Sequence, residues 1–277
     1  MKGKKGWTVA VRGPKGDIHI KRESLSDLPK VLKLPLVRGI IALFHAMSIG
    51  IKALEFSASK AYEEDGKGLS PLAIVSTIGV AIILGIVLFI LLPLYTTKLL
   101  GTLFLSVNKS SFFFNIVDGV IRIMVFLGYI VAIGMWKEMR RIFEYHGAEH
   151  KVIHAYENGK ALTINNIKDN SPLHPRCGTS FLLIVMIVSI FTFSCIPQNW
   201  SFLYKLLSRI ILIPLIAGMS FEFLKLSAKL SKNSFIHLLI KPGLLLQRLT
   251  TREPDDKQIE VAIKALEEVL GIEEAHA

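Results

Sequence analysis

Two long stretches without a charged side chain limit what this chain can fold into. Lys67 and Lys98 bracket thirty uncharged residues, and Arg176 and Lys205 bracket twenty-eight. Each stretch exceeds the roughly 20 apolar residues that a helix needs to cross a bilayer. The composition agrees, because only 20% of the side chains are charged, whereas an ordinary soluble domain carries about 25%. The sequence therefore predicts a membrane protein that crosses the bilayer several times.

Hydropathy predicts the positions of the transmembrane helices. We expect four, at Leu72–Tyr95, Phe113–Met135, Thr179–Pro197 and Leu203–Leu226. The fold class is expected to be all-α, a polytopic α-helical membrane protein with about four transmembrane helices, a small N-terminal β-hairpin and cytosolic or interfacial helices. This four-helix domain occupies residues 71–232 and includes a cytosolic loop at 137–178.

The segments on either side of this domain have patterns of their own. Residues 1–24 alternate apolar and polar side chains around Gly13-Pro-Lys-Gly16, which predicts a β-hairpin. Residues 25–70 contain a helical apolar pattern interrupted by charges, which favours a helix lying in the membrane interface over a fifth span. Residues 233–277 contain an apolar segment broken by Lys241-Pro-Gly and then an amphipathic C-terminal helix. We expect the first to be interfacial or re-entrant and the second to be soluble.

The distribution of basic residues predicts the orientation. Residues 1–70 carry thirteen Lys and Arg, 137–178 carry seven and 225–277 carry eight, whereas 96–112 carry two. The positive-inside rule then places both termini and the 137–178 loop in the cytosol, in a multi-pass protein of the cell membrane. Anionic head groups of the lipid bilayer account for the net charge of +11. Nucleic-acid binding is not expected, because the basic residues are not interleaved with aromatic ones.

Two other classes of protein are excluded. The chain has two cysteines, too few for the disulfide framework of a small secreted domain. The first thirty residues contain no apolar stretch that would suit a cleavable secretory signal, so we expect the N-terminus to stay in the cytosol.

The chemistry is concentrated in the 137–178 loop. Four of the eight histidines, His146, His150, His154 and His174, lie there within twenty-nine residues, and Cys177 follows. We expect residues 136–156 to continue the second transmembrane helix into the cytosol, because they contain no proline and one glycine. The first three histidines would then share one helical face.

The segment from His146 to His150 has the H-x-x-E-H order of inverted zincins. Residues four apart on a helix point the same way, so both imidazoles can bind one Zn²⁺. Glu149 stands where it can act as a general base toward a metal-bound water. The alternative is a cytosolic helix with solvated histidines and no metal.

A second motif, His174-Pro-Arg-Cys-Gly, lies where the chain enters the third predicted span. His174 and Cys177 are both able to bind metal, although a Pro-Gly turn with a buried cysteine would give the same sequence. With His146 and His150 they make four candidate ligands. Four protein ligands form a closed structural zinc site, whereas three leave a position open for water, and the spacing does not decide between them.

Several ionisable residues lie inside the predicted spans, where charge is costly unless it is paired. Asp118 and Arg122 are four residues apart, and we interpret them as an ion pair in preference to a transport pathway. Glu222 is a spare candidate acid for the site, or else it neutralises Arg209 or Lys205.

In the two motifs at His146–His150 and His174–Cys177 the chain resembles a known family, the YqhQ-like bacterial membrane proteins. These proteins contain a domain of unknown function that is described as a predicted metal-dependent enzyme. The resemblance covers nearly the whole chain and is strongest in the two motifs, with weaker blocks at Pro35-Leu-Val-Arg-Gly39 and Phe221-Glu222. It departs at the start, where only Met1-Lys-Gly3 remains of a usual glycine-rich stretch. The resemblance implies a site made of His146, Glu149, His150, His174, Arg176 and Cys177, and it leaves His154 out.

The leading hypothesis is a zinc-dependent hydrolase that acts on a membrane-associated substrate. In it His146 and His150 hold Zn²⁺, His174 or Cys177 completes the set, Glu149 accepts a proton from water, and Arg176 stabilises an oxyanion. The rival hypothesis is a non-catalytic assembly factor, scaffold or transport-related protein with a structural zinc. Beyond the lipid bilayer, the expected partner is an unknown membrane-associated substrate or protein.

Overall fold

The computed structural model describes the whole chain except residues 27, 28, 30, 31, 33, 62–70, 109, 175, 176, 198, 230–233, 276 and 277. Its elements are β1 Gly6–Arg12, β2 Ile18–Ser24, α1 Val37–Ala61, α2 Pro71–Ile86, the π-helix η3 Val87–Leu91, α3 Leu92–Leu103, the 3₁₀ helix η4 Leu105–Asn108, α4 Ser111–Gly134, α5 Lys137–Glu157, α6 Ile164–Lys168, α7 Gly178–Ser194, α8 Phe202–Ile211, α9 Ile213–Lys229, α10 Ser234–Thr250 and α11 Asp256–Ala275.

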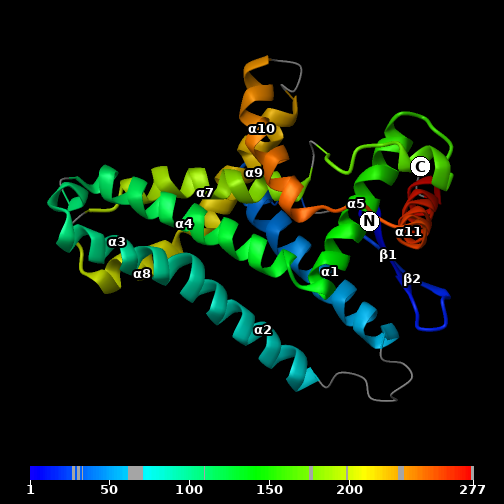
Figure 1. Ribbon diagram of the computed structural model, residues 1–277, viewed down its shortest axis with the longest axis horizontal. Coiled ribbons are helices and arrows are strands. Elements are labelled where there is room, and N and C mark those ends of the chain that lie inside the picture. Colours follow the sequence, from blue (N-terminus) through cyan, green and yellow to red (C-terminus); the bar gives the residue numbers. More distant parts are fainter. Residues whose placement is uncertain are drawn as a thin grey trace.

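The apolar helices form one part of the molecule, and α5, α11 and the hairpin form the other, where both chain ends lie (Figure 1). Among the described residues three helical segments are long and apolar enough to cross a membrane, and a fourth is added if the bent pair α8 and α9 counts as one span. They are Val37–Lys60, Val75–Leu103, Ser111–Gly134 and the pair Phe202–Ile211 with Ile213–Leu226. The fold-class prediction of an all-α polytopic membrane protein is thereby confirmed.

The spans differ in detail from the predicted ones. Helix α1, which we expected in the interface, meets the same length and hydropathy criteria as α4, because thirteen uncharged residues separate Arg38 from Lys52. The predicted third span is the shorter apolar helix α7. The fourth is bent by 46° between α8 and α9. Pro214 explains this bend, since it lacks the N–H that would continue the helix and its ring clashes with the preceding turn.

The prediction that the second span continues as one helix to residue 156 is wrong. Helix α4 ends at Gly134, and Trp136 is extended, with φ −76° and ψ 132°, before α5 begins at Lys137. The change of direction lets α5 bury Ala148, Val152 and Ala155 against α11. A straight continuation would leave these side chains in water, so tertiary packing outweighs the helical propensity of the connection.

Helix α11 closes the smaller part of the molecule. Its apolar face packs on α5 through Ile259, Ile263 and Leu266. The strands β1 and β2 pair in antiparallel register, and β1 packs against the same helix. Trp7 is buried there, and the Thr8 hydroxyl donates to the Ala265 carbonyl at 2.7 Å. This arrangement holds α5 from one side and leaves its histidine face toward the end of α10, Pro172, Leu173 and Cys177.

Helix α10 also differs from the prediction. We expected a break at Lys241-Pro-Gly, but Pro242 lies inside one continuous helix. A proline in a helix costs about 3 kcal/mol, and close packing on α7 offsets that cost. A Cβ added to Gly243 would stand 2.6 Å from the Ser180 hydroxyl oxygen. The continuous helix ends at Thr250, whose carbonyl belongs to the site.

Candidate metal centre

Three side chains from two helices meet beside the end of α10. His146 and His150 lie one turn apart on α5, with ring centroids 4.4 Å apart. Cys177 is the N-cap residue of α7, and its Sγ lies 3.2 Å from Nε2 of His146. One ligand atom from each of the three residues can be chosen so that all lie within 4.8 Å of one another. In the part of the chain that the structure describes, no other group of three or more such residues meets this criterion.

Backbone carbonyls orient both imidazoles. Nδ1 of His146 lies 2.8 Å from the Thr250 carbonyl oxygen, and Nδ1 of His150 lies 2.6 Å from that of Pro172. A carbonyl oxygen can only accept, so each Nδ1 donates, which leaves Nε2 of each ring for the contact with Cys177 or for a metal. Metal-binding histidines in proteins are held in this way, with the second nitrogen fixing the tautomer and the ring plane.

Cys177 is a thiolate candidate because of its neighbours. Burial acts to raise the pKa of its thiol, but hydrogen bonds with His146, His150 and Thr179 outweigh burial and lower the pKa to about 5. The Thr179 hydroxyl contributes at 3.3 Å. Burial opposes charging of His146, yet its contacts with Cys177 and the Thr250 carbonyl raise the pKa of the imidazole. A thiolate is the form of cysteine that binds metal.

The donor set fits a zinc ion. Zn²⁺ binds thiolate at about 2.3 Å and imidazole at about 2.0–2.1 Å, so tetrahedral ligands stand roughly 3.3–3.6 Å apart. The distance of 3.2 Å between Nε2 of His146 and Sγ of Cys177 lies just below this range. One thiolate and two imidazoles, without a carboxylate, suit zinc better than magnesium or calcium, which prefer oxygen ligands.

His174 lies beside this group and has other contacts. Its ring centroid is 5.8 Å from that of His150, and its Nε2 lies 3.3 Å from the Glu157 carboxylate. Burial lowers the pKa of the imidazole. Gln247 of α10, which is fully buried, accepts from the His174 backbone N–H and donates to its carbonyl, both at 2.8 Å. His154 approaches the far side of His174, with centroids 4.6 Å apart.

Glu149 and Arg176 are the two residues that we expected to act in catalysis. Glu149 is half-buried; burial lowers the pKa of the Met1 amino group and the charge of Glu149 opposes that shift, and the same charge makes the smallest contribution to the raised pKa of His146. It therefore lies within electrostatic reach of the site. Arg176 lies outside the described residues.

Sequence reasoning missed the groups that support the ligands. Thr250 and Pro172 act through their backbone carbonyls, and Gln247 acts from another helix through its side chain. No spacing rule identifies such residues. Gly147 left a weak signal as the single glycine in α5. A Cβ there would stand 2.0 Å from the Arg252 carbonyl oxygen, so the glycine allows the chain after α10 to approach α5 beside His146.

Replacing Gly147 with alanine should disturb the site through this close approach. Moving the Arg252 backbone shifts Thr250 and hence the carbonyl that orients His146. We expect a loss of about 1–3 kcal/mol in the free energy of unfolding, the usual cost of overpacking, together with weaker zinc binding. Gly128→Ala in α4 is the matched control, since its Cβ would meet no atom within 4 Å. Thermal unfolding in detergent measures both, and equal melting temperatures would contradict the role given to Gly147.

Both acidic residues of the predicted spans, Asp118 and Glu222, have a basic partner. Asp118 and Arg122 form the predicted ion pair, with 2.6 Å between Oδ2 and Nη2. The prediction that Glu222 neutralises Arg209 or Lys205 is wrong, because it accepts from Nε of Arg38 at 2.6 Å. The close packing of α1 on α9 at Gly39 and Gly218 brings those two side chains together.

The chain was compared with known proteins. The profile of a family described as "Protein of unknown function (DUF1385)" matches residues 34–272. A Bacillus subtilis (strain 168) protein named "Uncharacterized protein YqhQ" is 35% identical over 287 residues, which cover 98% of this chain and 89% of that protein. No solved structure matches the chain. The chain therefore belongs to the DUF1385 family of YqhQ-like proteins.

Proposed function

We propose that this protein is a membrane-embedded zinc enzyme whose metal is held by His146, His150 and Cys177. The observation that carries the proposal is the meeting of three ligand atoms within 4.8 Å, with each imidazole oriented by a backbone carbonyl. Three protein ligands are the number found in catalytic zinc sites, which keep a fourth position for water or substrate.

The proposed reaction is hydrolysis of a membrane-associated substrate. Zinc would supply a Lewis acid and lower the pKa of a water molecule toward about 7. Glu149, half-buried beside His146, is the candidate general base that accepts the proton of that water. Cys177 immediately precedes the apolar helix α7, so a substrate at the site would also touch the membrane domain. Arg176 stays the candidate for oxyanion stabilisation.

A structural zinc site is the second candidate. The ring centroid of His174 lies 5.8 Å from that of His150, so His174 could become a fourth ligand if it gave up its contact with Glu157 and moved closer to the cluster. Four ligands would tie α5, α7 and the 172–177 segment together without catalysis, as in an assembly factor, scaffold or transport-related protein. The two candidates are separated by comparing zinc content with function in complementation of a deletion strain, for Glu149→Gln and Cys177→Ser. Only the enzyme needs Glu149.

The site is proposed to face the cytosol, because of the excess of Lys and Arg in its loop. A cysteine placed at the exposed Asn165 should then react with a membrane-impermeant maleimide only after the cells are opened. The exposed native Cys195 lies beyond the other end of α7 and should react in intact cells, so it is an internal control. Labelling of Asn165→Cys in intact cells, with Cys195 protected, would reverse the orientation.

A further inference from the structure

The membrane domain contains a cavity of about 480 Å³ that the metal centre does not use. Helices α1, α2, α4, α7, α8 and α9 all contribute to its wall, which is apolar except at one end. The volume falls in the range of roughly 300–1,000 Å³ that is usual for ligand pockets. Representative apolar lining residues are Ile82, Ile86, Phe126, Phe181 and Met186.

The polar end is formed by two buried arginines. Arg122 of α4 and Arg209 of α8 line the cavity together with Ser189, and their guanidinium groups lie 5.0 and 5.2 Å from the ring centroid of Phe193. Arg122 donates to Ser189 at 2.9 Å and to Asp118 at 2.6 Å. Arg209 lies 3.2 Å from the other oxygen of Asp118. Two positive charges therefore share one carboxylate.

Among the residues that the structure describes, no second acid forms an ion pair with Arg122 or Arg209. The other acidic residue in the predicted spans, Glu222, is bound to Arg38. Among the described residues, three arginine nitrogens have no hydrogen-bond partner: Nε of Arg122, and Nε and Nη1 of Arg209. Oδ1 of Asp118 also lacks one, because its contact with Arg209 is poorly aligned. An uncompensated charge and unsatisfied donors are costly inside a membrane domain. These donors are themselves closed off by the protein, so it is the surplus positive charge of the two arginines lining the cavity that points to an anionic group at this end.

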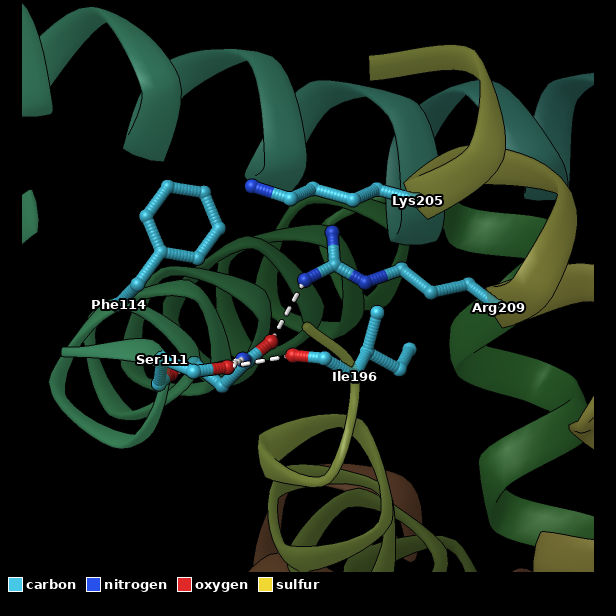
Figure 2. A pocket seen from close by; sticks show the side chains of 6 residues that line it. Ser111, Phe114, Ile196, Lys205 and Arg209 are labelled. Carbon is cyan, nitrogen blue, oxygen red and sulfur yellow. Dashed lines mark hydrogen bonds between the residues drawn. The ribbon is translucent and has the colours of Figure 1, made fainter. Parts of the chain in front are cut away.

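The space around Arg209 limits the size of that group. In a second, small pocket that Arg209 also lines, Lys205 and Arg209 extend from α8 toward Phe114 and Ser111 (Figure 2). Arg209 donates there to Asn115 at 2.9 Å, and the remaining volume is about 10 Å³. That volume holds about one water molecule. A head group larger than a carboxylate has no room beyond the arginines.

The length of the cavity indicates what is attached to the anion. On α7 the lining residues run from Phe181 to Phe193, which is about 18 Å at 1.5 Å per residue. One leaflet contributes about half of the roughly 30 Å of hydrocarbon in a bilayer. Ile82 and Leu182 line the cavity and are 53% and 42% exposed, so the cavity is open to the surroundings of the membrane domain. An acyl chain thus fits the length of the cavity and can reach it from the bilayer.

We propose that this cavity binds a long-chain fatty acid, with its carboxylate at Arg122 and Arg209 and its acyl chain along the apolar wall toward Phe181. Arginine suits this role because its planar guanidinium matches a carboxylate. The negative charge of the carboxylate balances the second arginine, and the acyl chain fills the apolar part of the cavity in place of bilayer lipid. The site is separate from the metal centre.

The test measures saturable binding of radiolabelled palmitate to the full-length protein in detergent. Hexadecanol is the neutral competitor with the same chain length, and acetate is the competitor without a chain. We expect one bound palmitate per chain. Hexadecanol should displace it at least about tenfold more weakly than unlabelled palmitate does, because hydrogen bonds to a charged group contribute this much or more to affinity. Acetate should not displace it. Equal competition by hexadecanol, or stronger competition by phosphatidylglycerol, would overturn the proposal.

Charge variants test the arginine end. Arg122→Gln leaves Arg209 balanced by Asp118, so palmitate affinity should fall at least about tenfold. Adding Asp118→Asn to that variant again leaves one arginine unbalanced and should restore most of the affinity. Wild-type affinity in Arg122→Gln, or no recovery in the folded double variant, would contradict the role of the unbalanced charge.

Glycine variants of α2 test the cavity even if the charge variants do not fold. A Cβ at Gly85 or Gly79 would meet no atom within 4 Å, but only Gly85 lines the cavity. Gly85→Leu should therefore lower palmitate affinity at least about tenfold through lost chain burial, and Gly79→Leu should leave it unchanged. Equal affinities would refute the site. Zinc content should be the same in all these variants, and Cys177→Ser should still bind palmitate, so failure here is distinct from failure of the zinc proposal.

Discussion

Changing Glu149 to glutamine is expected to lower activity about 10²–10⁴-fold while zinc stays bound, which is the usual contribution of a general base. An amide is nearly isosteric with a carboxylate but cannot accept the proton of water. The ligands do not depend on Glu149, because the carbonyls of Thr250 and Pro172 orient the two imidazoles. Zinc content and complementation of a deletion strain, measured on the same preparations, separate catalysis from metal binding.

The matched control is Glu138→Gln, the same chemical change at an exposed position in the first turn of the same helix. It should leave both zinc and function unchanged. A Glu149→Gln variant with full zinc and full complementation would end the hydrolase proposal. It would leave the structural site as the remaining explanation of the ligand cluster.

Changing Cys177 to serine is expected to lower zinc affinity by more than about 100-fold. Loss of a group that only supports a ligand costs 10–100-fold, and here a ligand itself is removed. Serine is a preferred N-cap residue, so the start of α7 should be preserved. The melting temperature should fall with the zinc content, because metal bound only to the folded state stabilises it.

Cys195→Ser is the control for this substitution, since Cys195 is exposed and far along α7. It should behave as the wild type. With a chelator present, the wild type and Cys177→Ser should melt at similar temperatures, because neither then holds zinc. A difference that persists in the chelator would assign the effect to packing of the buried Cys177 and not to metal.

The sequence predicted the class of fold because hydropathy in a membrane protein is a strong local signal. It failed where helices turn. The break between α4 and α5 is set by burial of Val152 against α11, more than a hundred residues away. Pro214 was visible in the sequence, but a proline inside an apolar stretch does not show whether the chain bends or ends there.

The ligands were predictable to different degrees. His146 and His150 follow from helical spacing alone, because four residues make about one turn. Spacing left His174 and Cys177 as alternatives; tertiary packing places Cys177 with the two histidines and His174 beside Glu157. Thr250 and Pro172 accept hydrogen bonds from the two imidazoles through main-chain oxygens. Any residue type could supply such an oxygen, so the sequence carried no sign of them.

Elemental analysis of the wild-type protein, purified in detergent without chelators and dialysed against metal-free buffer, tests whether the three residues bind zinc. We expect about one zinc per chain, lost when His146, His150 or Cys177 is replaced and retained in Cys195→Ser. Protein that is folded, carries no zinc and fails to bind added zinc would contradict this expectation. So would zinc that remains stoichiometric when all three ligands are removed.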